Sequence, residues 1–453
     1  MKPTEKVWKR LNLFSNAMRK LVNIKLQDLS FFLLIVFFVD SVIHIGRHFT
    51  ASGTDYLRLP LLIVLFCSCL PALIKDKKFF SSYYTHLIGI VLLVLMVSYV
   101  KAVLLNQNIE LANDFLLPFI YLSLFPILIY SVKTEVQLMR LVFIITIIGC
   151  LISLGLVLLV LSFVINYDLY CSLSDFMELF ELGYALGGAA GVIRFLPKGV
   201  AVQIMAYFFG VFYCLKKKEK KYILLVLING LALFLTFTRG IWLGLFCGTI
   251  FLLIRYKFAN FPKNNKIKRM IRFGIYSGFI IVLLLAILYP DIFDFAFGRI
   301  FGEHYTSKSD DLRKTMTKML YELISEHIAW GGGAGAHIEL RDGRVEMTYH
   351  DVASKIGVIG LIILMLPFLN ILFEKFIIKK DDDFRLLQLC ALSSFISILV
   401  SSYTNPYFIT SFGLFLYCFC MRIYSYRRYP FEKCKIDNKK GNVSFYKLLK
   451  LAK

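Results

Sequence analysis

Residues 141–165 read LVFIITIIGCLISLGLVLLVLSFVI and contain no charged side chain. A helix of this length extends about 37 Å, which exceeds the roughly 30 Å of hydrocarbon in a bilayer. The stretch therefore predicts a membrane-spanning helix. The rest of the chain agrees, since its 453 residues are 58% hydrophobic and 16% aromatic, with a mean hydropathy of +0.69.

Similar apolar runs recur along the whole chain. Including residues 141–165, we count twelve: 29–46, 57–74, 86–105, 114–131, 141–165, 199–215, 222–237, 240–256, 273–289, 351–373, 387–404 and 407–424. Only helices and closed barrels satisfy all their backbone groups inside lipid, and runs this apolar favour helices. The sequence predicts one all-α domain, residues 1–453, folded as a polytopic transmembrane bundle of about twelve spans.

The net charge of +22 comes from 52 Lys and Arg residues against 30 Asp and Glu. Most basic residues lie at the termini and in every second connector, and therefore on one side of the membrane, which is the pattern of cytoplasmic anchoring and not of nucleic-acid binding. We expect both termini in the cytoplasm, with basic segments at residues 1–28 and 425–453. The first span lacks a small-residue cleavage site, so we expect it to be retained.

The orientation places two larger loops outside the cytoplasm, at residues 166–198 and 290–350. The second loop contains apolar residues at helical spacing, preceded by Ser309, Asp310 and Asp311 as a cap and first-turn acids. We expect an amphipathic helix on the outer membrane surface. Its apolar residues are Leu312, Met316, Met319, Leu320, Leu323 and Ile324.

The chain has ten cysteines, and most of them fall inside the apolar runs. Their spacing indicates neither a disulfide framework nor a zinc site. The sequence predicts no metal and no cofactor.

An arginine interrupts two apolar runs at the outer surface, in Thr236-Phe237-Thr238-Arg239-Gly240-Ile241-Trp242-Leu243-Gly244-Leu245. A forked, permanently charged guanidinium is suited to binding a phosphate or diphosphate. The alternative is an arginine that reaches ordinary phospholipid phosphates. Arg194 and Arg313 stand at two other outer edges, and the three arginines could converge on one diphosphate.

Two further segments could carry chemistry. In Trp330-Gly331-Gly332-Gly333-Ala334-Gly335-Ala336-His337 the glycines either bring backbone amides to an anion or only allow a sharp turn, and the turn is favoured. His350, directly before a span, can accept a proton near neutral pH, or it is a polar residue at the membrane edge. Asp351 and Lys355 lie one helical turn apart and can form an ion pair.

At these residues the chain resembles the O-antigen ligases and polysaccharide polymerases of the Wzy type, which are membrane glycosyltransferases of the type C kind. The resemblance covers about residues 194–373. The matching pieces are Thr238-Arg239-Gly240, Trp242-Leu243-Gly244, Arg313, the turn 331–335, His350 and Gly357-Val358-Ile359-Gly360-Leu361. Two departures are Asp351, where the family usually has Asn, and a shorter spacing from the histidine to the Gly-x-x-Gly pair.

The resemblance implies a metal-independent glycosyltransferase of the bacterial inner membrane. It would transfer a glycan from a polyprenyl (undecaprenyl) diphosphate carrier to a sugar hydroxyl on the outer face, and so polymerise O-antigen, capsule or exopolysaccharide. Arg239 and Arg313 would hold the diphosphate, Arg194 would be a third phosphate contact, and His350 would be the base. The expected partners are the lipid-linked oligosaccharide, the bilayer, and chain-length regulator or flippase proteins, with no nucleic acid.

Other functions remain open at this point. A ligase would use the same donor and transfer the glycan to a lipid A core sugar. A transporter of lipid-linked oligosaccharides also has about twelve spans, but it would need more charged residues inside them. A peptidoglycan polymerase of the cell-elongation type would have fewer spans and acidic catalytic residues.

Overall fold

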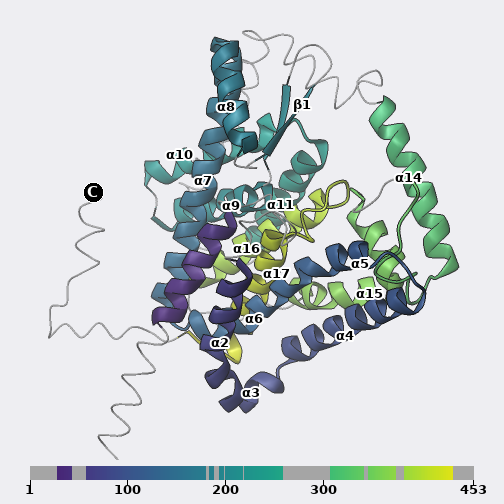
Figure 1. The fold of residues 1–453 in the computed structure, drawn as a ribbon. Helices are drawn as coiled ribbons and strands as arrows, with labels where there is room; N and C mark the ends of the chain where they lie inside the picture. The colour runs from purple at the N-terminus through teal and green to yellow at the C-terminus, as the bar shows by residue number, and fades with distance from the viewer. Residues whose placement is uncertain are drawn as a thin grey trace, which may run out of the picture.

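A computed structural model describes residues 28–42, 58–179, 183–187, 193–197, 199–217, 219–258, 307–340, 345–373 and 382–431. Residues 28–42 are helical. In the first half, the elements that follow are α2 (Arg58–Lys75), α3 (Lys77–Phe80), α4 (Tyr83–Leu104), α5 (Ile109–Leu116), η2 (Leu117–Ser123), α6 (Leu124–Ser131), α7 (Glu135–Ile165), α8 (Tyr167–Leu179), β1 (Gly183–Gly187) and β2 (Ile193–Pro197). The second half contains α9 (Val200–Lys217), α10 (Lys220–Leu235), α11 (Arg239–Phe258), α14 (Ser307–Glu326), α15 (Thr348–Phe373), α16 (Asp382–Ser401), α17 (Ser411–Tyr424) and η4 (Ser425–Arg427) (Figure 1).

Seven segments of the described chain are long and apolar enough to cross a membrane, which makes this a multi-pass membrane protein. They are α4, the continuous stretch from α5 through α6, α7, α9, α11, α15 and α16. Three shorter apolar helices, α2, α10 and α17, coincide with other expected spans. The expected span at 273–289 lies outside the described residues, so the total of twelve stays a prediction.

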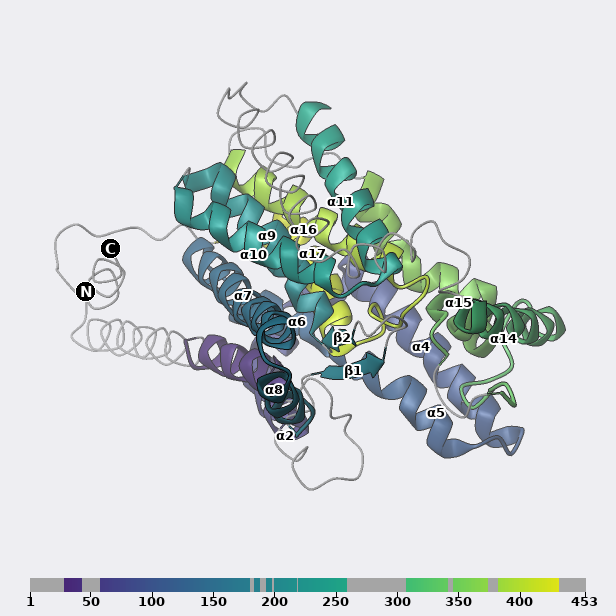
Figure 2. The same cartoon turned by 90° about the horizontal axis from the view of Figure 1, so that it is seen from above.

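Helices α9, α16 and α17 form the centre of the bundle, with α7, α10 and α11 packed around them (Figure 2). In the most apolar stretch of α16, 83% of the residues are buried, whereas in α11 the share is 22%. The exposed side chains of α11 include Leu243, Phe246 and Ile254. These exposed apolar side chains are suited to contact with lipid.

Helix α11 lies against α16 through a line of small residues. Gly240, Gly244 and Gly248 are spaced four apart on α11, so they share one face of the helix. A Cβ atom on Gly244 would lie 2.1 Å from the Ser401 hydroxyl and 2.4 Å from the Ser397 carbonyl oxygen. Such close contact between helices is typical of small residues in membrane bundles. It fixes the start of α11 beside the end of α16.

Replacing Gly244 with alanine is therefore expected to destabilise the bundle. The added methyl would push against the backbone of α16, and overpacking of this kind costs about 1–3 kcal/mol. Gly155→Ala is the matched control, because a Cβ atom there meets nothing within 4 Å. Thermal unfolding of the purified proteins in detergent should give a lower midpoint for Gly244→Ala only. Equal midpoints for the two variants would contradict the close packing.

Helix α15 is interrupted at Gly357, where φ is +77° and ψ is 170°. The interruption frees the carbonyl groups of the preceding turn from their helical partners. The Ser354 carbonyl accepts instead from the amide of Gly332 at 2.7 Å, and the Lys355 carbonyl accepts from the amide of Gly333 at 3.1 Å. These amides serve backbone pairing, which supports the turn interpretation of the glycine segment over an anion site.

The same segment pairs with the other side of the interruption. The amides of Val358 and Ile359 donate to the carbonyls of Ile328 (2.9 Å) and Ala329 (3.3 Å). A Cβ atom on Gly357 would lie 2.1 Å from the Ala329 carbonyl oxygen, so only glycine fits here. Broken helices persist in membranes where neighbouring chain satisfies the freed groups. Residues 328–333 do so, and they fix the first half of α15.

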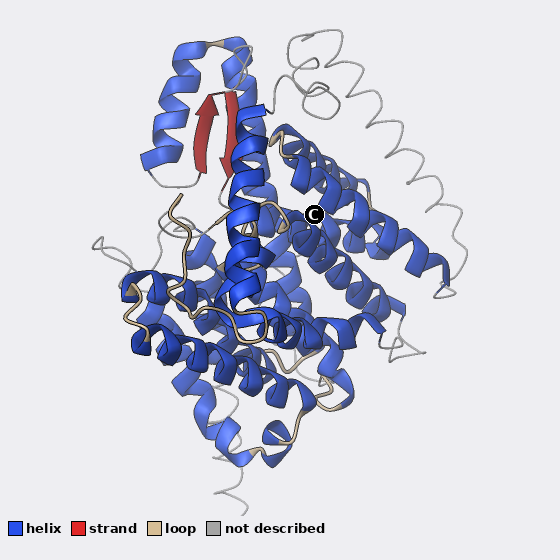
Figure 3. Cartoon of the chain, turned by 90° about the vertical axis from the view of Figure 1, so that its right-hand side faces the viewer, coloured by secondary structure: helices blue, strands red, loops and turns tan. Residues whose placement is uncertain are grey.

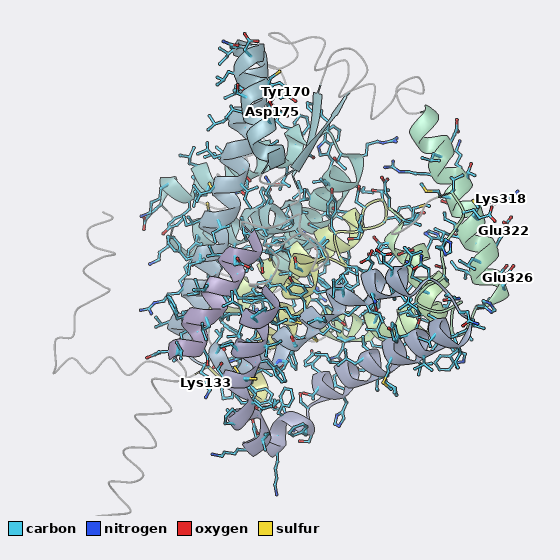
Figure 4. The ribbon with its side chains drawn as sticks, viewed as in Figure 1. Lys133, Tyr170, Asp175, Lys318, Glu322 and Glu326 are labelled. Carbon is cyan, nitrogen blue, oxygen red and sulfur yellow. The ribbon has the colours of Figure 1, made fainter. Side chains whose placement is uncertain are left out.

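Helix α14 confirms the helix expected in the second loop, but it begins at Ser307, so Ser309 lies in its first turn and the expected cap at Ser309 is wrong. Met316 and Leu320 are buried against Ile338, Val345 and Met347 from the chain that follows α14. That chain covers part of the face that was expected to rest on the membrane surface. Leu312, expected on the same face, is 50% exposed. The opposite face is charged: Figure 4 shows Lys318, Glu322 and Glu326 along its outer edge.

The loop 166–198 carries structure that the sequence did not indicate. After one extended residue, Asn166, helix α8 folds back so that Tyr170 packs against Leu156 and Leu159 of α7. Strands β1 and β2 then form an antiparallel pair in which Arg194 opposes Leu186 (Figure 3). This ribbon is the exception to an otherwise helical fold in the residues that the structure describes.

Candidate active site

Arg239 is the first residue of α11, directly after a tight turn at residues 236–238. Within the turn, Phe237 has a φ of +49°, which is strained for a bulky side chain. Its ring is buried and contacts Trp242 edge to face, with centroids 6.5 Å apart. Trp242 in turn stacks on Phe234 at 5.0 Å and donates from Nε1 to the Phe234 carbonyl at 3.0 Å. The aromatic cluster holds the turn and thereby positions Arg239.

The start of α11 lies against the turn that joins α16 to α17. A Cβ atom on Gly240 would lie 2.3 Å from the Thr404 hydroxyl and 3.6 Å from the Asn405 amide nitrogen. Because Gly240 follows Arg239, the backbone of the arginine reaches the same turn. Residues 403–405 therefore lie next to the Arg239 region.

The turn 403–405 is also a neighbour of His350, near the start of α15. The His350 ring contacts the Tyr403 ring at 6.1 Å between centroids. Two residues earlier, the Thr348 hydroxyl donates to the Asn405 carbonyl at 3.2 Å. The structure thus brings the Arg239 and His350 regions together on one turn, although they come from separate helices.

Helix α14 brings Arg313 to the same region. Its Nη2 and Nε atoms both donate to Oε2 of Glu346, at 2.9 and 3.3 Å. Two turns further along α14, the Tyr321 ring contacts the His350 ring at 5.0 Å and 81°. Residues 313 and 321 are about 12 Å apart along the axis and within about 80° around it. One side of α14 therefore adjoins the segment 346–350 (Figure 2).

The His350 imidazole is half-buried. Its Nδ1 atom is buried and has no hydrogen-bond partner in the described part of the chain. The opposite edge of the ring carries Nε2, and we expect an acceptor hydroxyl to approach there. A neutral imidazole presenting Nε2 can accept a proton.

Asp351 and Lys355 form the ion pair expected from their spacing, with Nζ 2.8 Å from Oδ1. Both side chains are buried, at 8% and 3% exposure, and the ammonium lies 4.9 Å from the centre of the Phe115 ring. Pairing offsets the cost of burying two charges in the bundle. Asp351 therefore has a structural partner one turn beyond His350.

Arg194 lies on β2, opposite Leu186 in the ribbon. Its side chain is outside the described residues, so its part in a shared phosphate site stays a prediction.

The sequence interpretation missed Glu346, Tyr321 and Tyr403. Glu346 and Tyr321 are ordinary residues of a loop and an amphipathic helix. Tyr403 lies in Ser402-Tyr403-Thr404-Asn405-Pro406. The Asn-Pro pair there predicts a turn but does not indicate which residues the turn contacts. Only the fold shows that all three adjoin Arg313 or His350.

Comparisons with known proteins agree with the resemblance seen in the sequence. Residues 224–365, which include Arg239, Arg313 and His350, match the family model described as O-antigen ligase. Over 252 residues the chain is 29% identical to a protein of Shigella flexneri named O-antigen polymerase. The matched region makes up 55% of this chain and 59% of that protein. No solved structure matches.

Proposed function

From the premise that this chain is a Wzy-type membrane protein related to O-antigen ligases and polymerases, we propose that it polymerises a surface polysaccharide. In this reaction a glycan passes from a polyprenyl diphosphate carrier to a sugar hydroxyl of another lipid-linked unit. The observation that carries the proposal is that the regions of Arg239 and Arg313 both lie next to the region of His350, around residues 346–350 and 403–405.

The proposed chemistry is a direct displacement at the anomeric carbon. The acceptor hydroxyl attacks that carbon and gives its proton to His350, while the bond from the carbon to the diphosphate oxygen breaks. The diphosphate leaves with the bonding electron pair. Arg239 and Arg313 stabilise its charge by bidentate hydrogen bonds. Attack opposite the leaving group inverts the anomeric centre, and Arg194 is proposed as a third phosphate contact.

We place this site on the outer face of the inner membrane, with both termini in the cytoplasm. Lys216 pairs with Asp383 at 3.0 Å, which joins the end of α9 to the start of α16, and the turn 403–405 follows the other end of α16. Arg239 and Arg255 lie at opposite ends of α11, about 24 Å apart. Figure 4 similarly places Lys133 and Asp175 at opposite ends of the molecule. Lys216 and Lys217 in the last turn of α9 and Arg255 and Lys257 in the last turn of α11 thus lie at helix ends away from the site, which supports this orientation.

The ligase reaction is the second candidate, because the matching family model is described as O-antigen ligase. It differs only in the acceptor, which would be a lipid A core sugar. The carrier-linked glycans that accumulate when the gene is deleted distinguish the two candidate reactions. Loss of the polymerase should leave single glycan units on the carrier, whereas loss of a ligase should leave long chains there. Carrier lipids that are unchanged by the deletion would contradict both.

The pair between Arg313 and Glu346 gives a prediction for the donor. Glu346 competes with a diphosphate for the guanidinium, and its charge repels that ligand. Replacing Glu346 with glutamine should lower the apparent KM for the lipid-linked unit about two- to fivefold, the range for a partly exposed ion pair. Initial rates with the lipid-linked unit extracted from deletion cells measure this change.

Asp311→Asn is the matched control for Glu346→Gln. Asp311 also pairs with a cation of α14, since its Oδ1 lies 3.5 Å from Lys314 Nζ, but both side chains are exposed. Its substitution should leave the KM unchanged. A KM that rises in Glu346→Gln would show that the carboxylate holds Arg313 in its working position and does not compete with the donor.

A further inference from the structure

Two tyrosines adjoin the base and have no part in the chemistry described so far. The rings of Tyr321 and Tyr403 both contact the imidazole of His350, at 5.0 and 6.1 Å between centroids. Both are widely exposed, at 58% and 59%. They come from α14 and from the turn after α16, so their meeting at His350 depends on the fold.

Tyr403 projects from a turn with a fixed backbone. The Ser402 hydroxyl accepts from the Phe408 amide at 2.8 Å and donates to the Ile398 carbonyl at 2.6 Å. Phe408 itself is fully buried. The exposed ring of Tyr403 is therefore carried by an anchored backbone, as a binding surface requires.

Tyr321 is anchored in a similar way. Its neighbour Leu320 is 1% exposed, and Thr317 donates to Sδ of Met347 at 2.7 Å. These contacts dock α14 on the segment that leads into His350. The ring of Tyr321 thus keeps its place beside the imidazole while its own surface stays accessible.

Exposed aromatic faces suit the C–H faces of a pyranose ring, because the negative face of the ring system attracts the weakly positive C–H groups. We propose that Tyr321 and Tyr403 form the acceptor-sugar subsite, where they stack on the pyranose whose hydroxyl His350 deprotonates. This inference rests on the proposed glycosyl transfer. The tyrosines are positioning residues, and they would govern the affinity for the acceptor more than the rate at saturation.

The test uses purified protein, the lipid-linked unit from deletion cells as donor, and the oligosaccharide released from that lipid by mild acid as a soluble acceptor. Tyr321→Ala and Tyr403→Ala should each raise the KM for the soluble acceptor about five- to tenfold, with kcat nearly unchanged. Phenylalanine at either position should restore the wild-type KM. Alanine variants with a wild-type KM, or phenylalanine variants no better than alanine, would overturn the proposal.

Leucine variants separate stacking from anchoring of the two rings at the membrane surface. Leucine keeps apolar bulk but has no aromatic face, so Tyr321→Leu and Tyr403→Leu should have the raised KM of the alanine variants. A wild-type KM in the leucine variants would assign the tyrosines to anchoring. Tyr83→Ala is the control, since Tyr83 is 49% exposed and contacts Tyr84 on α4.

The two proposals fail in different ways. Wild-type protein that elongates the lipid-linked unit but does not use the soluble acceptor would contradict the subsite alone. Wild-type protein that forms no glycosidic bond from the lipid-linked unit would contradict the proposed function as well.

Discussion

A chain carrying His350→Ala is expected to make no detectable polymer while accumulating in the membrane at the wild-type level. Without the imidazole, no group at this position accepts the proton of the attacking hydroxyl. Removal of a positioned base lowers the rate about 10²- to 10⁴-fold. Polymer extracted from deletion cells that express the variant measures the effect in cells, and single-turnover transfer with purified protein measures the rate.

Two further histidine variants separate proton transfer from hydrogen bonding and general damage. His350→Gln keeps a polar side chain that cannot accept a proton at the reacting hydroxyl, so it should be as inactive as alanine. His337→Ala is the control, because His337 is exposed and its Nδ1 lies 3.3 Å from the carbonyl oxygen of nearby Gly335. Wild-type polymer from His350→Ala would remove the base from the mechanism.

Hydropathy predicted most of the helical framework. The expected spans at 199–215 and 240–256 correspond closely to α9 and α11, because long apolar runs leave the backbone no partner in lipid other than its own helix. Shorter features were harder to predict. The expected span at 114–131 forms from part of α5 together with η2 and α6, with Pro118 at the start of the 3₁₀ segment, where it lacks an amide to donate.

The interruption of α15 could not be predicted, because it depends on partners far away in the sequence. Gly357 adopts a left-handed φ within an apolar run that reads as one continuous helix, and the pairing with residues 328–333 sustains it. Lys101 also holds this segment in place from far away in the sequence, because its ammonium donates to the Gly331 carbonyl at 2.5 Å. Spacing along the chain reveals local periodicity but not such contacts.

The same distinction between local pattern and distant contact applies to the candidate site. The residue types of Arg239, Arg313 and His350 indicated phosphate binding and proton transfer, since each carries that chemistry in its own side chain. Their common neighbours could not be read from the sequence. Tyr403 becomes relevant only because α16 ends beside α11 and α15.

Replacing Arg239 is expected to have the other large effect. Arg239→Ala should lower the transfer rate by about 10²- to 10³-fold, as for the loss of a donor that stabilises transition-state charge. Arg239→Lys should still lose at least about tenfold, because an ammonium is a point charge that cannot donate two parallel hydrogen bonds to a diphosphate. Single-turnover transfer with saturating lipid-linked unit measures both losses.

Arg255→Lys is the matched control, at the other end of the same helix. Arg255 donates from Nη2 to the Leu372 carbonyl at 2.6 Å and lies 5.6 Å from the Phe251 ring centre, so a lysine there can keep a donor and a cation. Its activity should stay near that of the wild type. If Arg239→Lys were equally active, a single positive charge would suffice at the start of α11. Arg239 would then be an anchor for membrane phosphates, and the bidentate contact to the leaving diphosphate would have to come from Arg313.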